Sequence, residues 1–446
     1  MKQALKYDVV VCGGGPAGIG AAIASARNGA RTLLVEQYAY LGGCATFGMP
    51  LLNFHTQKME KIIDGIPQEI VDEMVKINGI TNHIPLKEGH ISSYTLVDAE
   101  AMKYISQKMV LDAGADIFFH THITEVLREK NRICGAVLGN KQGAQYVFAN
   151  HLIDCTGDAD VALKAGAVTL QGDQSGATQA LTMNFRLGGV DFKKLTQWID
   201  RDVAYAMKPG EDEIDFLRGW GTFGRWQSIL DEMKIFKDKE HQIFVNSFRR
   251  GELNCNTIKV LDLDPTDPEE LSKAEIAARN QVWQVFQFMK ENCPGCEKAY
   301  ILSTPTQIGI RETRRIKGDY ELQTEDVLHG KKFPDVIARG AYTIDIHDPA
   351  TGHISFRYVG GDGSYDIPYG CLIPQELEGL LVAGRCLSAS HEAIGSARVM
   401  AICMAMGQAA GTAAALSLKN NCTERQLNIG VLQKTLLSQK VNLGKR

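Results

Sequence analysis

The sequence lacks the features that mark three large classes of protein. Its 446 residues carry 48 Lys and Arg against 52 Asp and Glu, a net charge of only −4, so it has no excess of positive charge for nucleic acid. The most apolar stretch, residues 380–416, is interrupted by charges such as Arg385 and Arg398, which a bilayer would not accept. The apolar run at residues 9–12 is too short for the core of a signal peptide. We therefore expect neither a nucleic-acid partner nor a membrane partner.

Cysteine is present at 11 positions, but in none of the patterns that hold a metal. The ferredoxin run C-x₂-C-x₂-C-x₃-C and the usual zinc spacings are absent, so we expect no iron–sulfur cluster and no metal site. Without a secretory signal, the thiols should stay reduced in a cytoplasmic protein. Cys293 and Cys296 form a C-x-x-C pair, and its place in a loop after a helix favours a surface thiol pair over a redox motif.

What is present at the start of the chain predicts a β-α-β unit. The apolar run at residues 7–12 predicts a strand, Pro16 the start of a helix, Gly29 its end, and residues 31–35 a second strand. Between strand and helix, residues 13–18 fit G-x-G-x-x-G, which places a pyrophosphate on the amides of the helix N-terminus. An acid roughly 20 residues later accepts hydrogen bonds from a ribose. The predicted contacts are Gly13, Gly15, Pro16, Ala17, Gly18, Glu36 and Gln37.

Three further segments favour FAD over NAD as the dinucleotide. Paired glycines in residues 41–45 would let backbone approach the middle of a long dinucleotide, and residues 155–158 end a later strand on the adenosine side. A third segment, residues 384–399, places a late strand end and a helix N-terminus where a flavin and its ribityl chain would lie, and NAD would not need it. The predicted contacts are Gly42, Gly43, Cys44, Ala45, Thr156, Gly157, Gly384, Arg385, Gly395, Ser396, Ala397, Arg398 and Val399.

The remaining patterns define an α/β protein with a discontinuous first domain. Apolar residues at helical spacing predict a helix at 96–113, and three β-rich runs at 123–128, 133–138 and 145–148 predict an antiparallel meander. Buried strands are expected at 151–154 and 380–384, and a long small-residue helix at 393–416. We predict an FAD-binding Rossmann domain from residues 1–166 and 339–446, with an inserted α+β substrate (cap) domain at 167–338.

These motifs resemble the FAD-dependent oxidoreductases of the glutathione-reductase superfamily, in the branch near fumarate-reductase flavoproteins and the FAD-carrying subunits of heterodisulfide reductases. The resemblance covers most of the chain but little of residues 189–299. It implies a glutathione-reductase-like fold, a backbone contact from Ile123 to adenine, and the flavin N1 and O2 edge facing residues 397–399. Where the superfamily often has a Gly-Asp pair, this chain has Gly384-Arg385, which implies a cationic contact instead. No second glycine fingerprint for NAD(P)H is evident in residues 167–338.

Four residues are candidates for chemistry. On a strand, Arg311 and Arg315 would share a face and bind an anionic substrate, although an ion-pair network with Glu312 explains them equally well. His391 precedes the flavin-edge helix and is a proton donor or acceptor, or else caps the turn. Cys44 has no second cysteine in residues 45–50, so a dithiol mechanism is not expected, but a flavin contact is. A weaker acid/base pair, Asp345 and His347, lies at residues 342–348.

The leading hypothesis is therefore an FAD-dependent oxidoreductase that transfers a hydride between bound flavin and a small organic substrate. The arginine face favours an anionic one, and an external electron donor or acceptor remains open. The alternative is an electron-relay flavoprotein that resembles the FAD-carrying subunit of heterodisulfide reductase, which the missing cluster cysteines weaken. A third class, a flavin-bound interaction protein without turnover, is disfavoured by the near-neutral charge.

Overall fold

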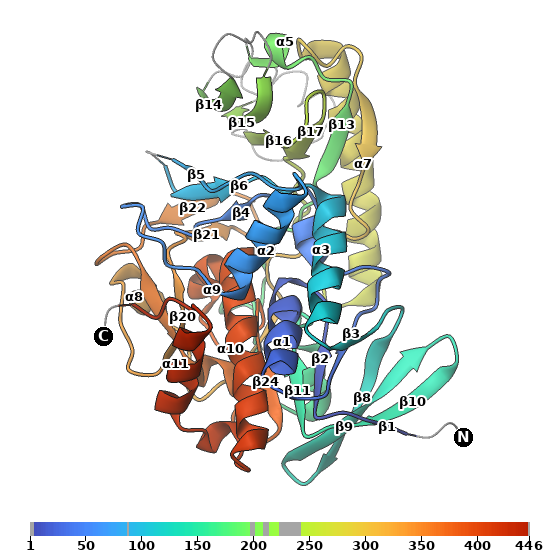
Figure 1. The fold of residues 1–446 in the computed structure, drawn as a ribbon. Helices are drawn as coiled ribbons and strands as arrows, with labels where there is room; N and C mark the ends of the chain where they lie inside the picture. The colour runs from blue at the N-terminus through green and yellow to red at the C-terminus, as the bar shows by residue number, and fades with distance from the viewer. Residues whose placement is uncertain (1–3, 87–88, 197–200, 208–213, 223–241, 445–446) are drawn as a thin grey trace.

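A five-stranded parallel sheet forms the centre of the protein. The structure, a computed structural model, describes residues 4–86, 89–196, 201–207, 214–222 and 242–444 (Figure 1). All neighbouring strands of the sheet are parallel, with Val9 opposite both Thr32 and His151. Every residue of the three inner strands is buried, as expected for strands covered on both faces. The strand order is β24 (Leu380–Val382), β11 (His151–Asp154), β2 (Val9–Cys12), β3 (Thr32–Val35) and β7 (Asp116–Phe118).

The sheet joins the two ends of the chain, because β24 pairs with β11 more than 200 residues earlier. The parallel sheet is thus built from both ends of the chain, as predicted, while the predicted domain boundaries at residues 166 and 338 stay a prediction. On one face of the sheet lie five helices. They are α1 (Pro16–Arg27), α2 (Ile66–Lys76), α3 (Ala99–Asp112), α10 (Met400–Lys419) and α11 (Ile429–Ser438).

The helices α1 and α10 pack in close parallel contact, because small residues line both. A Cβ atom on Gly407 would lie 1.9 Å from the carbonyl oxygen of Ala17, and one on Gly411 would lie 2.1 Å from that of Ala21. Only glycine allows the two backbones to approach this closely. Among the described helices, α10 alone is long and apolar enough to cross a bilayer, but 94% of its most apolar window is buried. The charges at 385–398 precede this helix rather than interrupt it, so burial is the observation that identifies it as core.

The predicted antiparallel meander is present on the other face of the sheet. Together with β1 (Leu5–Lys6), the meander forms a four-stranded sheet in the order β1-β10-β9-β8. The helix α4 (Asp160–Ala165) packs on β8. Its apolar side chains share one cluster with β2 and β11. The three strands of the meander are β8 (His122–Glu129), β9 (Arg132–Asn140) and β10 (Gly143–Phe148).

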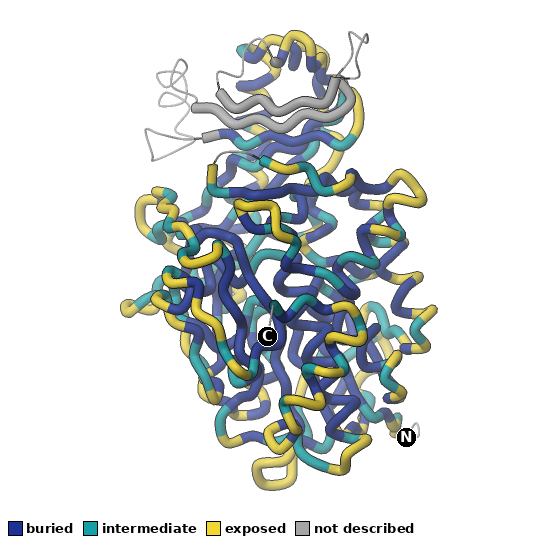
Figure 2. Tube along the Cα trace, turned by 60° about the vertical axis from the view of Figure 1, so that its left-hand side comes forward, coloured by how far each residue is buried: buried dark blue, intermediate teal, exposed yellow. Residues whose placement is uncertain are grey.

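A second, antiparallel sheet forms the cap, at the top of Figure 1. It has a separate apolar core, drawn entirely from residues 181–308, under α7 (Pro268–Asn292) and near α5 (Phe192–Thr196). Figure 2 shows the buried trace concentrated in the body of the molecule below the cap. The strands follow the order β14 (Arg201–Met207), β15 (Ile214–Thr222), β16 (Gln242–Ser247), β17 (Leu253–Asn256), β13 (Phe185–Gly188) and β18 (Tyr300–Ser303).

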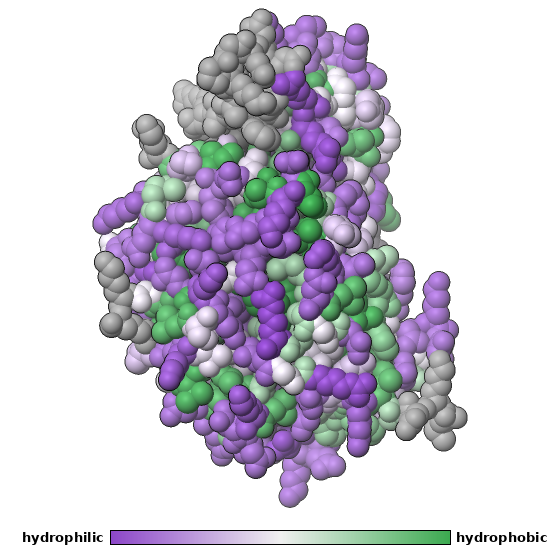
Figure 3. All heavy atoms as spheres, in the orientation of Figure 1, coloured by the Kyte–Doolittle hydropathy of each residue, from purple (hydrophilic) through white to green (hydrophobic). Residues whose placement is uncertain are grey.

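Short elements connect the two sheets. They form one three-stranded and three two-stranded sheets, and Figure 3 shows the mainly hydrophilic face that covers this region. The strands are β4 (Leu51–Leu52), β5 (Ile84–Pro85), β6 (Ser93–Thr95), β12 (Thr169–Gln171), β19 (Arg314–Ile316), β20 (Val336–Gly340), β23 (Tyr365–Pro368), β21 (Ile344–His347) and β22 (Ile354–Arg357). The helices are α8 (Thr324–Leu328), α9 (His391–Ala397) and the 3₁₀ turns η1 (Gly43–Thr46), η3 (Tyr369–Leu372) and η4 (Glu424–Gln426).

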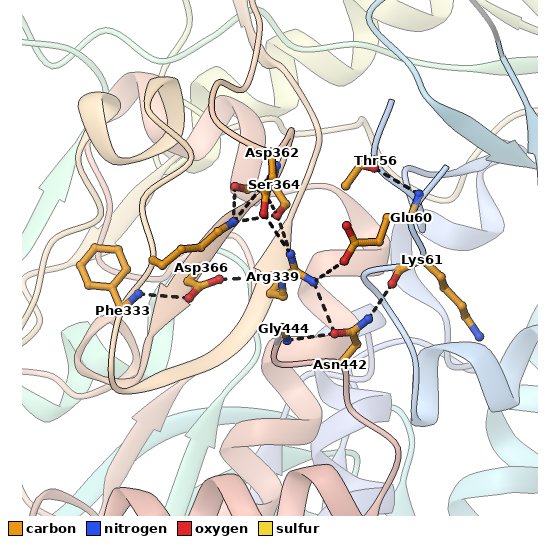
Figure 4. A network of polar contacts seen from close by, with 11 residues as sticks. Thr56, Glu60, Lys61, Phe333, Arg339, Asp362, Ser364, Asp366, Asn442 and Gly444 are labelled. Carbon is orange, nitrogen blue, oxygen red and sulfur yellow. Dashed lines mark hydrogen bonds and ion pairs between the residues drawn. The ribbon is translucent and has the colours of Figure 1, made fainter. Parts of the chain in front are cut away.

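A buried arginine fastens the C-terminal segment to this middle region. Arg339 of β20 is 3% exposed and donates hydrogen bonds to the Ser364 hydroxyl, at 2.7 Å, and to the Asn442 side chain, at 3.3 Å (Figure 4). Its guanidinium also lies 3.5 Å from the Glu60 carboxylate, and Asp362 and Asp366 are slightly farther away. Because these partners come from distant parts of the chain, the network holds them in one arrangement.

Two sequence predictions are wrong in detail. The helix expected at 393–416 is broken, since Val399 has extended backbone angles and separates α9 from α10. The strand expected around Arg311 is short, because only Arg314–Ile316 form β19, and Arg311 lies in the preceding irregular segment. Arg311 and Arg315 therefore do not lie on one face of a strand, and each side chain has its own hydrogen-bond partner.

Candidate active site

The glycine loop after β2 forms an open cradle at the N-terminus of α1. A Cβ atom on Gly13 would lie 2.6 Å from the Cys155 carbonyl oxygen, and one on Gly18 would lie 1.8 Å from the Gly13 carbonyl oxygen, so protein packing requires both glycines. At Gly15, by contrast, a Cβ atom would meet nothing within 4 Å. Gly15 is the N-cap of α1, without a side-chain cap or an acid in the first turn. The space beside it and the free amides suit a pyrophosphate.

Glu36 braces this loop from the end of β3. Its carboxylate accepts hydrogen bonds from the backbone amides of Gly14, at 2.6 Å, and Tyr38, at 2.8 Å. Burial raises the pKa of Glu36, and these amide contacts oppose that effect. The carboxylate thus stands beside the cradle at the position of the predicted ribose contact, while Gln37 is exposed.

The paired glycines of the next loop lie against the cradle. The Gly42 amide donates to the Gly14 carbonyl oxygen at 2.9 Å, and a Cβ atom on Gly43 would lie 3.0 Å from the Gly15 Cα. Gly42 has φ 113°, a left-handed conformation that favours glycine. Ala45 is buried, whereas Cys44 is exposed. The loop therefore carries the Cys44 side chain toward the space that the cradle faces.

The loop after β11 is held by Asp154 and brings Gly157 against Arg385. The Asp154 carboxylate accepts hydrogen bonds from the amides of Thr156, at 3.0 Å, and Ala162, at 2.8 Å. Gly157 has φ 84°, and a Cβ atom there would lie 2.7 Å from the Arg385 guanidinium. That guanidinium pairs with Asp158 at 2.9 Å, but its buried Nη1 has no hydrogen-bond partner. An anionic group of a cofactor would satisfy this atom.

A second free helix N-terminus points the same way as that of α1. α10 begins after Val399 with no side-chain cap and no acid in its first turn. Because Ala17 of α1 lies level with Gly407, α10 extends six residues, roughly 9 Å, beyond the start of α1. A pyrophosphate at α1 and a flavin edge at α10 would be about a ribityl chain apart. Both helix dipoles favour negative charge at these positions, including that of reduced flavin.

The residues before this N-terminus face protein rather than a cofactor. A Cβ atom on Gly395 would lie 2.8 Å from the Asp345 carbonyl oxygen, and the Ser396 hydroxyl donates to the Tyr342 carbonyl oxygen at 2.5 Å. With the buried Ala397, they fix α9 against β21. Of the predicted flavin-edge residues, Arg398 and Val399 are the ones left partly exposed at the break between the helices.

A buried charged cluster lies next to this break. The Asp345 carboxylate accepts a hydrogen bond from the Tyr342 hydroxyl at 3.0 Å and lies 3.3 Å from His347 Nε2 and 3.7 Å from the Arg398 guanidinium. Burial opposes ionisation of Asp345, but His347, Arg398 and Arg311 together hold its pKa well below the usual range. Burial lowers the pKa of His347 to about 4 and raises that of Tyr342. His347 Nδ1 and Arg398 Nε are buried without a hydrogen-bond partner.

Arg311 and Arg315 have different surroundings, although the sequence grouped them. Arg311 belongs to the charged cluster and donates to the Ala180 carbonyl oxygen at 2.5 Å. Arg315 is fully engaged elsewhere, by the Ala389 carbonyl oxygen at 2.8 Å, the Gly172 carbonyl oxygen at 3.0 Å, and the carboxylate of Glu312. The ion-pair alternative therefore describes Arg315, and the ligand-binding alternative fits Arg311 alone.

His391 is held by the same buried carboxylate. Its Nδ1 lies 2.8 Å from Glu312, which is fully buried, and the His391 side chain remains 17% exposed. This contact fixes the ring and leaves Nε2 for a ligand, as in pairs where a carboxylate orients a catalytic histidine. The backbone role of capping α9 belongs to the preceding residue, Ser390, whose hydroxyl accepts from the Ala393 amide at 3.2 Å.

Two further predicted positions lie apart from the cluster. Ile123 is half-buried in β8 and lies opposite Leu138 of β9. Two residues before it, the Thr121 amide donates a hydrogen bond to the Glu36 carbonyl oxygen at 3.0 Å.

Cys293 and Cys296 are 2% and 0% exposed, so the predicted surface thiol pair is wrong. The chain turns back under the cap sheet where α7 ends, and burial raises the pKa of Cys296 to about 12 and that of Cys293 further.

A family model described as "FAD dependent oxidoreductase" matches residues 8–436. The chain belongs to the FAD-dependent oxidoreductase family. Curated relatives include thiamine thiazole synthases of Aeropyrum pernix, 32% identical over 140 residues (31% of this chain, 46% of that protein), and Saccharolobus solfataricus, 31% identical over 170 residues (36% and 58%). The matched stretch thus spans about half the length of these relatives.

Solved structures agree on the fold of this FAD-dependent oxidoreductase. A geranylgeranyl bacteriochlorophyll reductase-like protein from Thermoplasma acidophilum aligns with TM-score 0.50 and 15% identity, over 99% of this chain and 85% of the other. The flavin-dependent brominase Bmp2, as a triple mutant, aligns with TM-score 0.50 and 12% identity, over 97% and 84%. The chain therefore has the α/β fold of FAD-dependent oxidoreductases and monooxygenases, and its cofactor is FAD.

The residues of this oxidoreductase fit FAD at three places. Gly15 leaves room for the pyrophosphate, Arg385 has a buried donor without a partner, and α10 presents free amides about a ribityl length away. Sequence reasoning named all three segments but missed Tyr342, and it did not foresee that Asp345 contacts Arg398. Asp345 and His347 are two residues apart and so share one side of a strand, which was the signal for them in the sequence. On sequence alone this pair was a weaker acid/base candidate than His391, but the structure places it at the break between α9 and α10.

Proposed function

We propose that this oxidoreductase transfers a hydride between the N5 atom of FAD and a small anionic organic substrate bound beside Arg311, His347 and Arg398. The observation that carries the proposal is the buried charged cluster at the start of α10, where three side-chain atoms, Asp345 Oδ1, His347 Nδ1 and Arg398 Nε, have no hydrogen-bond partner among the described residues. FAD supplies the hydride acceptor or donor. The protein residues supply binding, orientation and proton transfer.

The charge of the cluster favours an anion. Arg311 has its pKa lowered by burial to about 10, so it remains positive at neutral pH, and Arg398 supplies a second guanidinium. Asp345 is negative, whereas His347 and Tyr342 are neutral. Two positive charges against one negative charge leave a net positive site, and a carboxylate would neutralise it. Because Nε2 of the neutral His347 ring faces the Asp345 carboxylate and carries the proton, Nδ1 is an acceptor, and a hydroxyl group of the substrate can donate a hydrogen bond to it.

His391 is the proposed proton donor or acceptor. Hydride transfer to or from carbon is accompanied by movement of a proton at a neighbouring atom, and a histidine near neutral pH serves this role. The contact with Glu312 orients the ring so that Nε2 is the atom that exchanges the proton. Replacement of Glu312 would disturb His391 and Arg315 together, so His391 itself is the better target for a test.

Anaerobic mixing of the holoenzyme with small organic acids tests the proposal. Reduction bleaches the visible absorption band of oxidised flavin, so a true substrate is recognised by rapid loss of this band. We expect Arg311→Leu to raise KM with a smaller effect on kcat, and His391→Gln to lower kcat by about 10²-fold or more. A control is Arg27→Leu, which removes an exposed ion pair with Glu69 at the C-terminal end of α1, outside the cluster. Unchanged kinetics in both test variants would refute the assigned roles.

The same assay separates the alternative function. The glycine motifs also support a place near fumarate-reductase flavoproteins and the FAD-carrying subunits of heterodisulfide reductases, a group whose members include electron relays. If no small molecule bleached the flavin but a reduced ferredoxin did, the chain would be an electron-relay flavoprotein. We favour the enzyme because the charged cluster is a binding site that a relay would not need.

A further inference from the structure

The described strands β13, β16 and β17 of the cap sheet carry polar side chains on the face away from α7, including buried asparagines and the half-buried ion pair of Arg186 with Glu252. Along residues 181–187 every second side chain lies in the apolar core under α7, namely Leu181, Met183, Phe185 and Leu187. Because side chains alternate along an extended chain, the residues between them turn to the opposite face. β17 continues the pattern, with Cys255 in the apolar core and Asn254 and Asn256 on the other face.

Three asparagines on this polar face have unsatisfied amide groups. Asn184, Asn246 and Asn254 are 4%, 3% and 5% exposed. Asn246 lies directly opposite Asn254 in the β16–β17 register. Four side-chain atoms have no hydrogen-bond partner within the described part of the chain: Asn184 Oδ1, Asn246 Nδ2, and both Nδ2 and Oδ1 of Asn254. Burying several polar atoms without partners is costly, so such a cluster indicates a ligand.

The polar face is turned toward the flavin loop. A Cβ atom on Gly48 would lie 2.6 Å from Asn254 Oδ1, and Gly48 follows the η1 turn that carries Cys44. At its other end the same segment reaches the charged cluster, because the Ala180 carbonyl oxygen accepts the hydrogen bond from Arg311. Asn184 is only four residues from Ala180. One extended segment therefore links the anion site to the asparagines.

We infer that Asn184, Asn246 and Asn254 form a second half of the substrate site, which binds uncharged hydroxyl or amide groups of the substrate. The inference rests on the proposed function for the position of the substrate. An amide side chain offers both a donor and an acceptor but no charge, so it pairs with groups that do the same. The substrate class is then an organic acid whose remainder is polar and neutral, rather than a fatty or aromatic acid.

Three carboxylate probes test this division of the site. Gluconate carries hydroxyls, N-acetylglycylglycine carries amides, and hexanoate carries neither, while each has a carboxylate as its only charged group. Titration of each into the holoenzyme is followed by the change in the visible flavin spectrum, which does not require turnover. We expect gluconate or N-acetylglycylglycine to bind at least about tenfold more tightly than hexanoate, because unpaired asparagine atoms reject a ligand without polar groups. The tighter of the two probes identifies hydroxyl or amide recognition.

The variants Asn246→Leu and Asn254→Leu should remove the preference for the polar probe and leave the affinity for hexanoate unchanged or higher. Asn280→Leu is the control, because Asn280 is exposed on α7. Thermal unfolding without a probe separates the two roles: an asparagine that only supports the fold loses stability on substitution, whereas a ligand-binding one does not. A preference that survives both substitutions, or wild-type binding of hexanoate as tight as that of both polar probes, would overturn the inference. Flavin bleaching tests the proposed function separately, so failure of one is not failure of the other.

Discussion

Gly407→Ala should separate the two helices that hold the cofactor. The new methyl group would lie 1.9 Å from the Ala17 carbonyl oxygen, and real Cβ contacts are almost never under 3.0 Å, so α1 and α10 must part by about 1 Å. Overpacking of this kind costs about 1–3 kcal/mol, and the clash with rigid backbone places it at the upper end. Alanine regains about 1 kcal/mol through its higher helix propensity. We expect a net loss of about 2 kcal/mol of unfolding free energy.

The effect on FAD should exceed the effect on a typical core variant, because the N-termini of both helices face the expected position of the cofactor. A shift of about 1 Å between them loosens contacts at the pyrophosphate or at the flavin, and a loss of about 1.4 kcal/mol weakens binding tenfold. Fluorescence titration of apoprotein with FAD measures the dissociation constant, and urea unfolding measures stability. Gly430→Ala in α11 is the matched control, since its Cβ would meet only the Asn428 side chain, at 3.2 Å. Normal FAD affinity and stability for Gly407→Ala would refute the close packing of α1 and α10.

Three other predictions concern the cradle, the acid range and the buried arginine. Gly15→Val should leave the fold intact but abolish FAD binding, because its side chain would fill the open space; yellow, normally stable protein would contradict this. Burial lowers the folded-state pKa of three histidines, His83, His151 and His347, to about 4. Between pH 6.5 and 4 the unfolded chain therefore binds more protons than the folded protein, and the protein should lose stability as the pH falls through this range. Urea unfolding midpoints that stay constant over this range would contradict the prediction. Arg339→Met should cost about 3–5 kcal/mol, since the buried Asp366 carboxylate loses the nearby positive charge, and calorimetry of the variant at pH 7 checks it.

The sequence predicted the parts of the fold that depend on local patterns. The β-α-β unit at residues 9–35 follows from a short apolar run, Pro16 and Gly29, and the structure places α1 from Pro16 to Arg27. The meander and β11 follow from alternating apolar runs between turn residues, and β11 spans His151–Asp154 as predicted. These elements are encoded within a few residues, so no knowledge of distant contacts was needed.

The failures came from contacts between distant residues. Nothing local breaks the helix at Val399, because the sequence there has neither proline nor a helix stop; the packing of α9 on β21 decides it. Arg315 looked like a ligand-binding residue because its carbonyl partners, Ala389 and Gly172, lie far away in sequence. The polar face of the cap had a visible signal, the alternation around Asn184, but only the structure shows that this face is covered.

The pairing of β24 with β11 and of α10 with α1 has a consequence for synthesis of the protein. When residue 380 has not yet left the ribosome, one edge of the parallel sheet and the small-residue side of α1 have no cover, and exposed edges and apolar surfaces attract other chains. Cofactor loading must then await nearly the whole polypeptide. A fragment that ends before β24 should emerge colourless and dependent on chaperones, however complete its glycine loop.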